Sequence, residues 1–216
     1  MLIEQPWKNV KKHFDNSQVY VPKLLHNLNI DPHAWKQFCI DHYKLGDHVW
    51  ESPKPYYSKK TVDLINANLS FGRHKLNTYE INFGKNHKAS SILKTILGND
   101  NLKKMNLNED FLLIRLLVKL PGQGVAWHVD EANTFLKKFP DLQVDKNYNT
   151  QYGKIVRYWF PVTDWEDGHM FQISKTILWQ YKKGDVFQIP FGIGHASANA
   201  GFTPYYSVAL TGIVKD

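Results

Sequence analysis

The sequence predicts a mainly β protein with flanking helices (α+β), built as a sandwich or barrel such as a jelly roll with an N-terminal helical annex. Two observations predict this class. Short β-type runs separated by turn residues fill the chain from Asp110 onward, whereas apolar residues before that point recur mainly at helical spacing. The 216 residues, of which 43% are hydrophobic and 22% charged, are enough to bury one sizeable core.

The N-terminal region, residues 1–109, is expected to form a mainly helical support that packs on the β core. Asp31 and Pro32 read as an N-cap followed by proline at the first helical position, and Gly46 is expected to end this helix. Glycine also closes the last helix of the region, at Gly98. Helices are further predicted at Lys60–Leu69 and Lys88–Leu97, and a strand at Lys75–Phe83.

The C-terminal region, residues 110–216, is expected to form the β core, so that the whole chain makes one compact domain. Turn residues such as Pro121-Gly122 and Asp167-Gly168 separate its apolar runs. The segment Glu131–Thr150 is predicted to be a short helix followed by a polar loop. Eight strands are predicted, at Phe111–Leu120, Gly124–Val129, Lys154–Pro161, His169–Ile173, Thr176–Tyr181, Asp185–Ile189, His195–Asn199 and Tyr205–Ile213. Four tryptophans within or beside these strands are expected to pack in the core: Trp127, Trp159, Trp165 and Trp179.

Cysteine usage and charge limit the function classes. Cys39 is the only cysteine, which excludes an intrachain disulfide and a cysteine-based zinc finger and favours a reducing, cytoplasmic setting. No secretory signal or membrane-spanning stretch is expected. The net charge of +7 would suit nucleic acid, but the lysines are scattered in pairs and only three arginines are present. Nucleic acid is therefore not the expected partner.

The run Phe111–Leu120 carries two different faces. Its even positions are apolar, while its odd positions include Arg115 and Lys119. Because side chains alternate across a strand, one face is apolar and the other carries two cationic side chains. With helices covering the apolar face, the charged face is expected to look into a polar cavity.

Two matches to the pattern His-x-Asp/Glu occur, and about one is expected by chance in a sequence with ten histidines and twenty acidic residues. The match His13-Phe14-Asp15 lies in a lysine-rich stretch with no strand pattern, and we interpret it as the chance one. In the second match His128 and Asp130 share one face of a strand, and His195 opens another strand. Two imidazoles and one carboxylate with open coordination positions are what a non-haem Fe(II) centre requires. His169 reads instead as a turn-flanking residue.

These motifs resemble the Fe(II)/2-oxoglutarate-dependent dioxygenase superfamily over roughly residues 111–213. The strings that carry the resemblance are LPGQGVAWHVD, YKKGDVFQIPFGIGHASANAG and YYSVALTG. The string VRYWFPV is similar to the arginine-bearing strand of the aspartyl/asparaginyl hydroxylase-type branch, which includes free-proline hydroxylases.

The resemblance implies a double-stranded β-helix, a cupin-like jelly roll, in which His128, Asp130 and His195 are the catalytic iron ligands. It implies 2-oxoglutarate and O2 as cosubstrates, with release of succinate and CO2 on hydroxylation of a C–H bond. A buried carboxylate of 2-oxoglutarate needs a cation. The family's Arg-x-Ser appears here as Tyr205-Tyr206-Ser207, so Ser207 remains and the cation is missing.

Two residues could supply the missing cation. Arg157 is the first candidate, because a guanidinium holds a carboxylate bidentately, and Lys119 is the second. Tyr205 could donate a hydrogen bond but could not neutralise the charge. The expected substrate is a small molecule or a protein side chain. Oxidative demethylation of nucleic acid and a degenerate, non-catalytic cupin-like binding module remain as alternatives, because fold alone does not choose among them.

Overall fold

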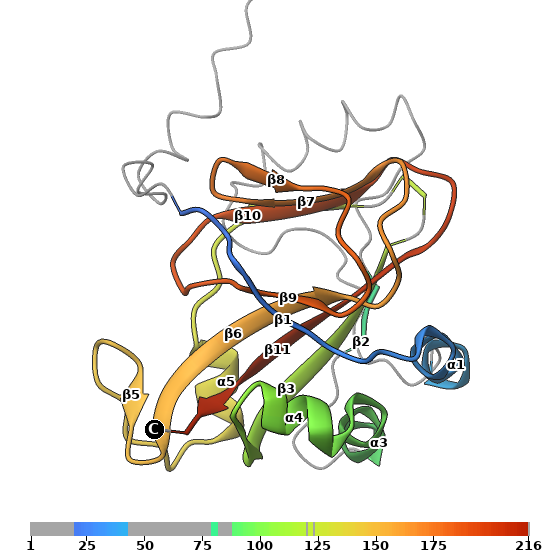
Figure 1. Ribbon diagram of the computed structural model, residues 1–216. Coiled ribbons are helices and arrows are strands. Elements are labelled where there is room, and N and C mark those ends of the chain that lie inside the picture. The colour runs from blue at the N-terminus through green and yellow to red at the C-terminus, as the bar shows by residue number, and fades with distance from the viewer. Residues whose placement is uncertain (1–19, 43–78, 82–87, 120, 123, 216) are drawn as a thin grey trace, which may run out of the picture.

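The protein is described by a computed structural model, in which residues 20–42, 79–81, 88–119, 121–122 and 124–215 are placed (Figure 1). Two antiparallel sheets face each other, as the sequence predicts for a jelly roll. The major sheet has the order β1-β9-β6-β11-β3-β2, with β5 added beside β6, and the minor sheet has the order β4-β10-β7-β8. The predicted mainly β fold class is confirmed.

The elements lie close to the predicted runs. The major sheet consists of β1 (Leu24–Asn27), β2 (Tyr79–Ile81), β3 (Leu107–Lys119), β5 (Asn149–Thr150), β6 (Gly153–Pro161), β9 (Asp185–Gln188) and β11 (Tyr205–Val214). The minor sheet consists of β4 (Gly124–His128), β7 (His169–Ile173), β8 (Thr176–Leu178) and β10 (His195–Asn199). The helices are α1 (Pro32–His42), α3 (Lys88–Leu97), α4 (Asn99–Lys104) and α5 (Asn133–Lys138).

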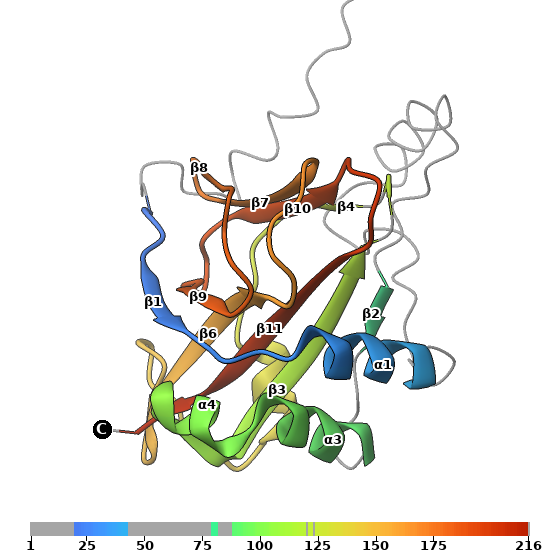
Figure 2. The same ribbon diagram turned by 45° about the vertical axis from the view of Figure 1, so that its right-hand side comes forward.

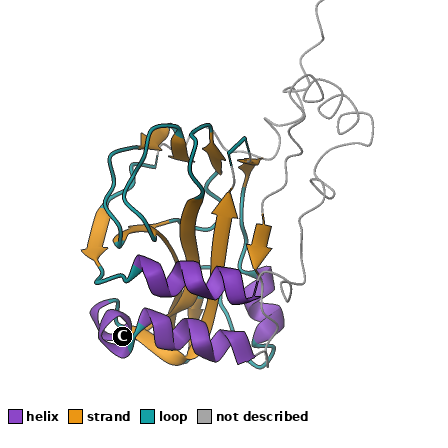
Figure 3. Ribbon diagram, turned by 90° about the vertical axis from the view of Figure 1, so that its right-hand side faces the viewer, coloured by secondary structure: helices purple, strands orange, loops and turns teal. Residues whose placement is uncertain are grey.

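Helices α1, α3 and α4 cover the face of the major sheet that turns away from the minor sheet (Figures 2 and 3). Trp35 and Phe38 of α1 and Leu93 of α3 are buried against the strands, and the Trp35 ring meets Phe160 edge-on at 6.3 Å between centroids. The same core includes even-numbered side chains of β3, as the period-2 pattern predicts: Leu112, Ile114, Leu116 and Val118. Burial of these apolar side chains fixes which face of the major sheet packs against the helices.

A second core fills the space between the two sheets. Trp159 of β6 stacks on Phe171 of β7 with 4.1 Å between ring centroids, so this contact joins the sheets. Tyr205 of β11 belongs to the same cluster and carries the buried Lys119 against its ring. The cationic face of β3 therefore looks into the barrel interior, as predicted.

Several local predictions are confirmed, and others are not. The backbone N–H of His33 donates to Asp31 Oδ1 at 2.9 Å, which confirms the N-cap of α1, and Gly98 follows α3 with a positive φ of 80°. The predictions for Lys60–Leu69, Gly46 and His13-Phe14-Asp15 fall outside the described residues. Trp179 is 65% exposed, so its predicted core position is wrong, since β8 ends at Leu178 and leaves it on the surface.

The N-terminal region contributes strands as well as helices. Strand β1 pairs with β9, and β2 pairs with β3, so both extend the major sheet. Strand β3 begins at Leu107, before the boundary predicted at residue 110. The division into two regions stays a prediction. Within the described residues, none of the helices combines the length and the apolar character needed to cross a membrane.

Candidate metal centre

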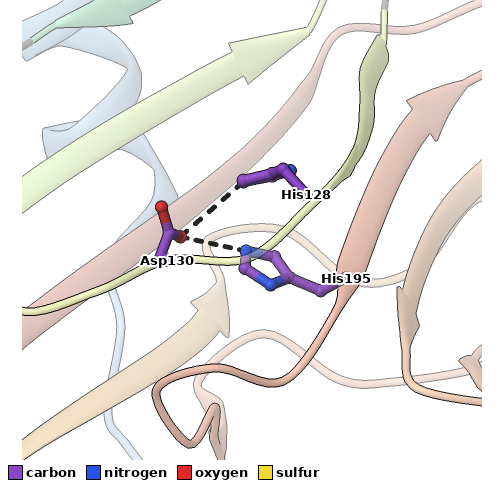
Figure 4. A group of neighbouring side chains, drawn as sticks. All are labelled: His128, Asp130 and His195. Atoms are coloured by element: carbon purple, nitrogen blue, oxygen red, sulfur yellow. Dashed lines mark ion pairs between the residues drawn. The ribbon is translucent and has the colours of Figure 1, made fainter. Parts of the chain in front are cut away.

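The three residues predicted as metal ligands come together at one end of the minor sheet. His128 is the last residue of β4, and His195 is the first residue of β10. The antiparallel pairing of these strands places the two histidines directly opposite each other. Asp130 follows two residues after His128, and Figure 4 shows its carboxylate turned toward both imidazoles.

The donor atoms of this triad are spaced as a metal site requires. Asp130 Oδ2 lies 3.1 Å from His195 Nε2 and 3.6 Å from His128 Nε2. The two imidazole centroids are 4.2 Å apart. Ligands bound at about 2.1 Å with angles of about 90–110° lie roughly 3.0–3.5 Å from one another. All three donor atoms lie within 4.8 Å of one another, so the triad could hold a small divalent cation.

The protonation state of His195 suits a ligand. Its Nδ1 lies 3.1 Å from the Ile193 carbonyl oxygen, which only accepts, so Nδ1 carries the proton and Nε2 presents its lone pair to the triad. Burial, offset in part by neighbouring Asp130, lowers the pKa of His195 to about 4. The imidazole is therefore neutral at pH 7.

Asp130 is ionised in the same setting. Burial alone would raise its pKa, but the Arg157 charge and the two neighbouring imidazoles outweigh burial and hold the pKa well below its usual range. Two electron-rich atoms, Asp130 Oδ2 and His195 Nε2, thus face each other at 3.1 Å. Such an approach is favourable only where a cation or a donor hydrogen serves both atoms.

Arg157 supplies that positive charge in this structure. This buried residue of β6 forms an ion pair with Asp130 through Nη1 and Oδ2. The same Nη1 lies 3.3 Å from His195 Nε2. The structure therefore brings Arg157, predicted as a cosubstrate residue, into direct contact with two of the three predicted metal ligands.

The other predicted cosubstrate residues lie deeper between the sheets. Lys119, Tyr205 and Ser207 are all 0% exposed. Lys119 pairs with Tyr205 across β3 and β11, and its Nζ lies 4.8 Å from the Tyr205 ring centroid. Burial raises the pKa of Tyr205 well above its usual value, so its hydroxyl stays protonated.

Strand register lines up three buried polar side chains on the inner face. Ser207 pairs with Leu117 and Pro161, so Lys119 on β3 and Trp159 on β6 are its diagonal neighbours on either side. Within the described part of the chain, Ser207 Oγ and Trp159 Nε1 are buried with no hydrogen-bond partner. Buried polar groups are normally paired, which points to an acceptor that would complete this row.

The two candidate cations stand at different ends of the sheet. Lys119 is level with Tyr205 on β11, whereas Arg157 is level with Thr211. Six residues of strand correspond to about 20 Å along β11. Arg157 thus lies at the triad, and Lys119 lies toward the far end of the interior.

A contact behind the triad was not anticipated from the sequence. Trp127 and Gly194 precede the two histidine ligands, and the Trp127 indole lies against the Gly194 backbone. A Cβ added at Gly194 would lie 2.6 Å from Trp127 Cζ2 and Nε1. Only glycine leaves room for this ring, and the one signal in the sequence was a glycine directly before a candidate ligand.

Comparisons with known proteins give likenesses of fold. No protein-family model and no curated sequence matches the chain. Among solved structures, the non-heme monooxygenase ThoJ in complex with nickel is 14% identical, covers 89% of this chain and 74% of its own, and has a TM-score of 0.44. A predicted oxalate decarboxylase from Thermotoga maritima is 12% identical, with 63% and 81% coverage and a TM-score of 0.34. A double-stranded β-helix protein from Klebsiella pneumoniae is 16% identical, with 50% and 72% coverage and a TM-score of 0.31.

Proposed function

We propose that this protein is an Fe(II)- and 2-oxoglutarate-dependent oxygenase that hydroxylates a C–H bond of a small molecule or a protein side chain. The observation that carries the proposal is the convergence of His128, Asp130 and His195, with 3.1 and 3.6 Å between the carboxylate oxygen and the two imidazole nitrogens. Two imidazoles and one carboxylate on one side of a metal are the donor set of non-haem Fe(II) oxygenases.

Bound iron and 2-oxoglutarate would supply the oxidising chemistry, in which O2 is consumed and the cosubstrate ends as succinate and CO2. The protein's own contribution starts with ligand orientation. Strands β4 and β10 hold the two histidines opposite each other, and the Ile193 carbonyl oxygen fixes the His195 tautomer. Asp130 contributes the single negative charge of the triad.

We assign the far carboxylate of 2-oxoglutarate to Lys119 and Ser207. The buried ammonium of Lys119 offers the charge that the family's missing arginine would have carried. The buried Ser207 hydroxyl, without a partner among the described residues, offers a donor beside it. The side chain of Asn199 donates to the Lys119 carbonyl oxygen at 2.8 Å and holds this end of β3 against β10.

The position of Arg157 favours Lys119 over Arg157 for this role. The guanidinium lies at the triad beside Asp130 and His195, whereas the Lys119 ammonium lies in the interior against the Tyr205 ring. We therefore propose that the far carboxylate of the cosubstrate pairs with Lys119 and not with Arg157. Arg157 would remain near the metal-binding end of the same molecule.

The aromatic interior suits a reaction from which water must be excluded. Trp159 and Phe171 stack between the sheets, and the Phe171 ring lies 6.2 Å from His195 between centroids. Tyr181 packs edge-on against Trp159. A dry wall of this kind strengthens electrostatic contacts and limits side reactions.

Succinate formation tests this proposal. The full-length protein is loaded anaerobically with Fe(II) and 2-oxoglutarate, air is admitted, and succinate is quantified. We expect succinate from the wild type and only background from His128→Ala. Equal background from both proteins would refute the oxygenase and leave the non-catalytic binding module as the better description.

A further inference from the structure

Arg157 occupies the place where the triad needs a positive charge. Its Nη1 is in ion-pair contact with Asp130 Oδ2 and lies 3.3 Å from His195 Nε2. These are the two atoms that a metal ion would share. Since His195 Nδ1 carries the proton, Nε2 is an acceptor, and the guanidinium N–H groups are the donors that serve it.

A divalent cation and this contact compete for the same lone pairs. Asp130 Oδ2 faces His195 at 3.1 Å and His128 at 3.6 Å, so a metal bound to it would lie beside the guanidinium. Like charges placed next to each other in a site that is partly shielded from water repel each other. One carboxylate oxygen therefore does not hold both cations equally well.

The contact also solves a problem of the metal-free protein. The Asp130 side chain is 27% exposed, and a carboxylate largely withdrawn from water is destabilised when it has no positive partner. The side chain of Arg157 is only 9% exposed, so its own charge likewise depends on this partner. Each charge of the pair is therefore stabilised by the other.

We propose that Arg157 is a positioning residue that takes the place of the metal ion in the metal-free protein and is displaced from Asp130 when a divalent cation binds. The proposal rests on the proposed metal centre. It predicts two opposite effects of Arg157. The residue raises the stability of the metal-free protein, and it lowers the affinity of the triad for a divalent cation. A residue that only holds the ligands in place would raise both the stability of the protein and its affinity for the metal.

Nickel(II), which does not change oxidation state under these conditions, serves as the probe. Its dissociation constant is measured by calorimetry for the full-length wild type, for Arg157→Met and for the control Arg115→Met. Arg115 lies on β3 of the same sheet, at a position of the same parity as Lys119, and is half-buried, so the control also removes one arginine charge from this sheet. Melting temperatures are recorded for each protein with and without nickel.

We expect Arg157→Met to bind nickel at least tenfold more tightly than the wild type and Arg115→Met to stay within twofold of it. The melting temperature of metal-free Arg157→Met should fall by several degrees, and nickel should raise it by more than it raises that of the wild type. If Arg157→Met does not fold without metal, Arg157→Lys, which keeps the charge on a non-planar head, should still bind nickel at least twofold more tightly than the wild type.

Unchanged or weaker nickel binding by the Arg157 variants would overturn the displacement proposal while leaving the metal centre in place. Absence of nickel binding by the wild type would instead remove the metal centre itself. The two failures are therefore distinguishable.

Discussion

The close contact between Gly194 and Trp127 predicts how sensitive the triad is to its support. In Gly194→Ala, the added Cβ would start 2.6 Å from Trp127 Cζ2 and Nε1 and 2.7 Å from Cε2. Carbon contacts are comfortable at about 3.5–4.0 Å, so the indole must move by about 1 Å. Both residues directly precede the histidine ligands, so this shift is passed to His128 and His195.

The expected cost has two parts. Overpacking of this kind destabilises a fold by about 1–3 kcal/mol. Displacement of a functional side chain by about 1 Å lowers the activity of a preorganised site by up to about a hundredfold. We therefore expect Gly194→Ala to weaken nickel binding by between tenfold and a hundredfold in a calorimetric titration.

Two further variants separate this effect from general destabilisation. Gly98→Ala is the control, because Gly98 has a φ of 80° and nothing within 4 Å, so alanine is strained there far from the triad. It should lower stability by about 1 kcal/mol without changing nickel affinity. The double variant Gly194→Ala/Trp127→Leu removes the clash and should recover part of the lost affinity. Nickel binding by Gly194→Ala within twofold of the wild type would refute the reasoning.

Three other predictions follow from burial and charge. Because the pKa of His195 is about 4 in the folded state and about 6.5 when unfolded, the unfolded chain takes up this proton first. The free energy of unfolding of the metal-free protein, measured with urea, should therefore fall by about 3 kcal/mol as the pH falls from 6.5 to 4. In His195→Gln it should change much less over this pH range. Lys119→Met should raise the apparent 2-oxoglutarate constant at least tenfold, and more than Arg157→Ala does, with nickel affinity unchanged; the reverse order would return the role to Arg157. Trp35→Ala, at 0% exposure, should cost about 3–5 kcal/mol in urea unfolding, whereas Trp179→Ala, at 65%, should stay within about 0.5 kcal/mol.

The sequence was most informative where a local pattern and the tertiary structure agree. The alternation in β3 separates an apolar face, which packs under the helices, from an inner face that carries Lys119. The strand context of His128-Val129-Asp130 selected two of the three converging ligands. Asp31 caps α1 as its residue type predicts. Each of these features depends on spacing within a short stretch of the chain.

The features that the sequence did not indicate depend on distant partners. Strand β1 has exposed Leu24 and Leu25 and no alternation, and it is a strand because it pairs with β9, where Asn27 Nδ2 donates to Asp185 Oδ1 at 2.8 Å. Helix α4 is short and polar, and Asn101 ties it to the Asn29 backbone. The contact of Arg157 with Asp130 joins β6 of the major sheet to the segment that follows β4 of the minor sheet, which no local spacing encodes.

The central claim is that His128, Asp130 and His195 form a metal centre. Anaerobic equilibrium dialysis of the full-length protein against Fe(II) tests it directly. We predict one iron per chain in the wild type and a loss of at least a hundredfold in affinity in His128→Ala, Asp130→Ala and His195→Ala. Iron bound equally well by the wild type and all three variants would contradict the claim.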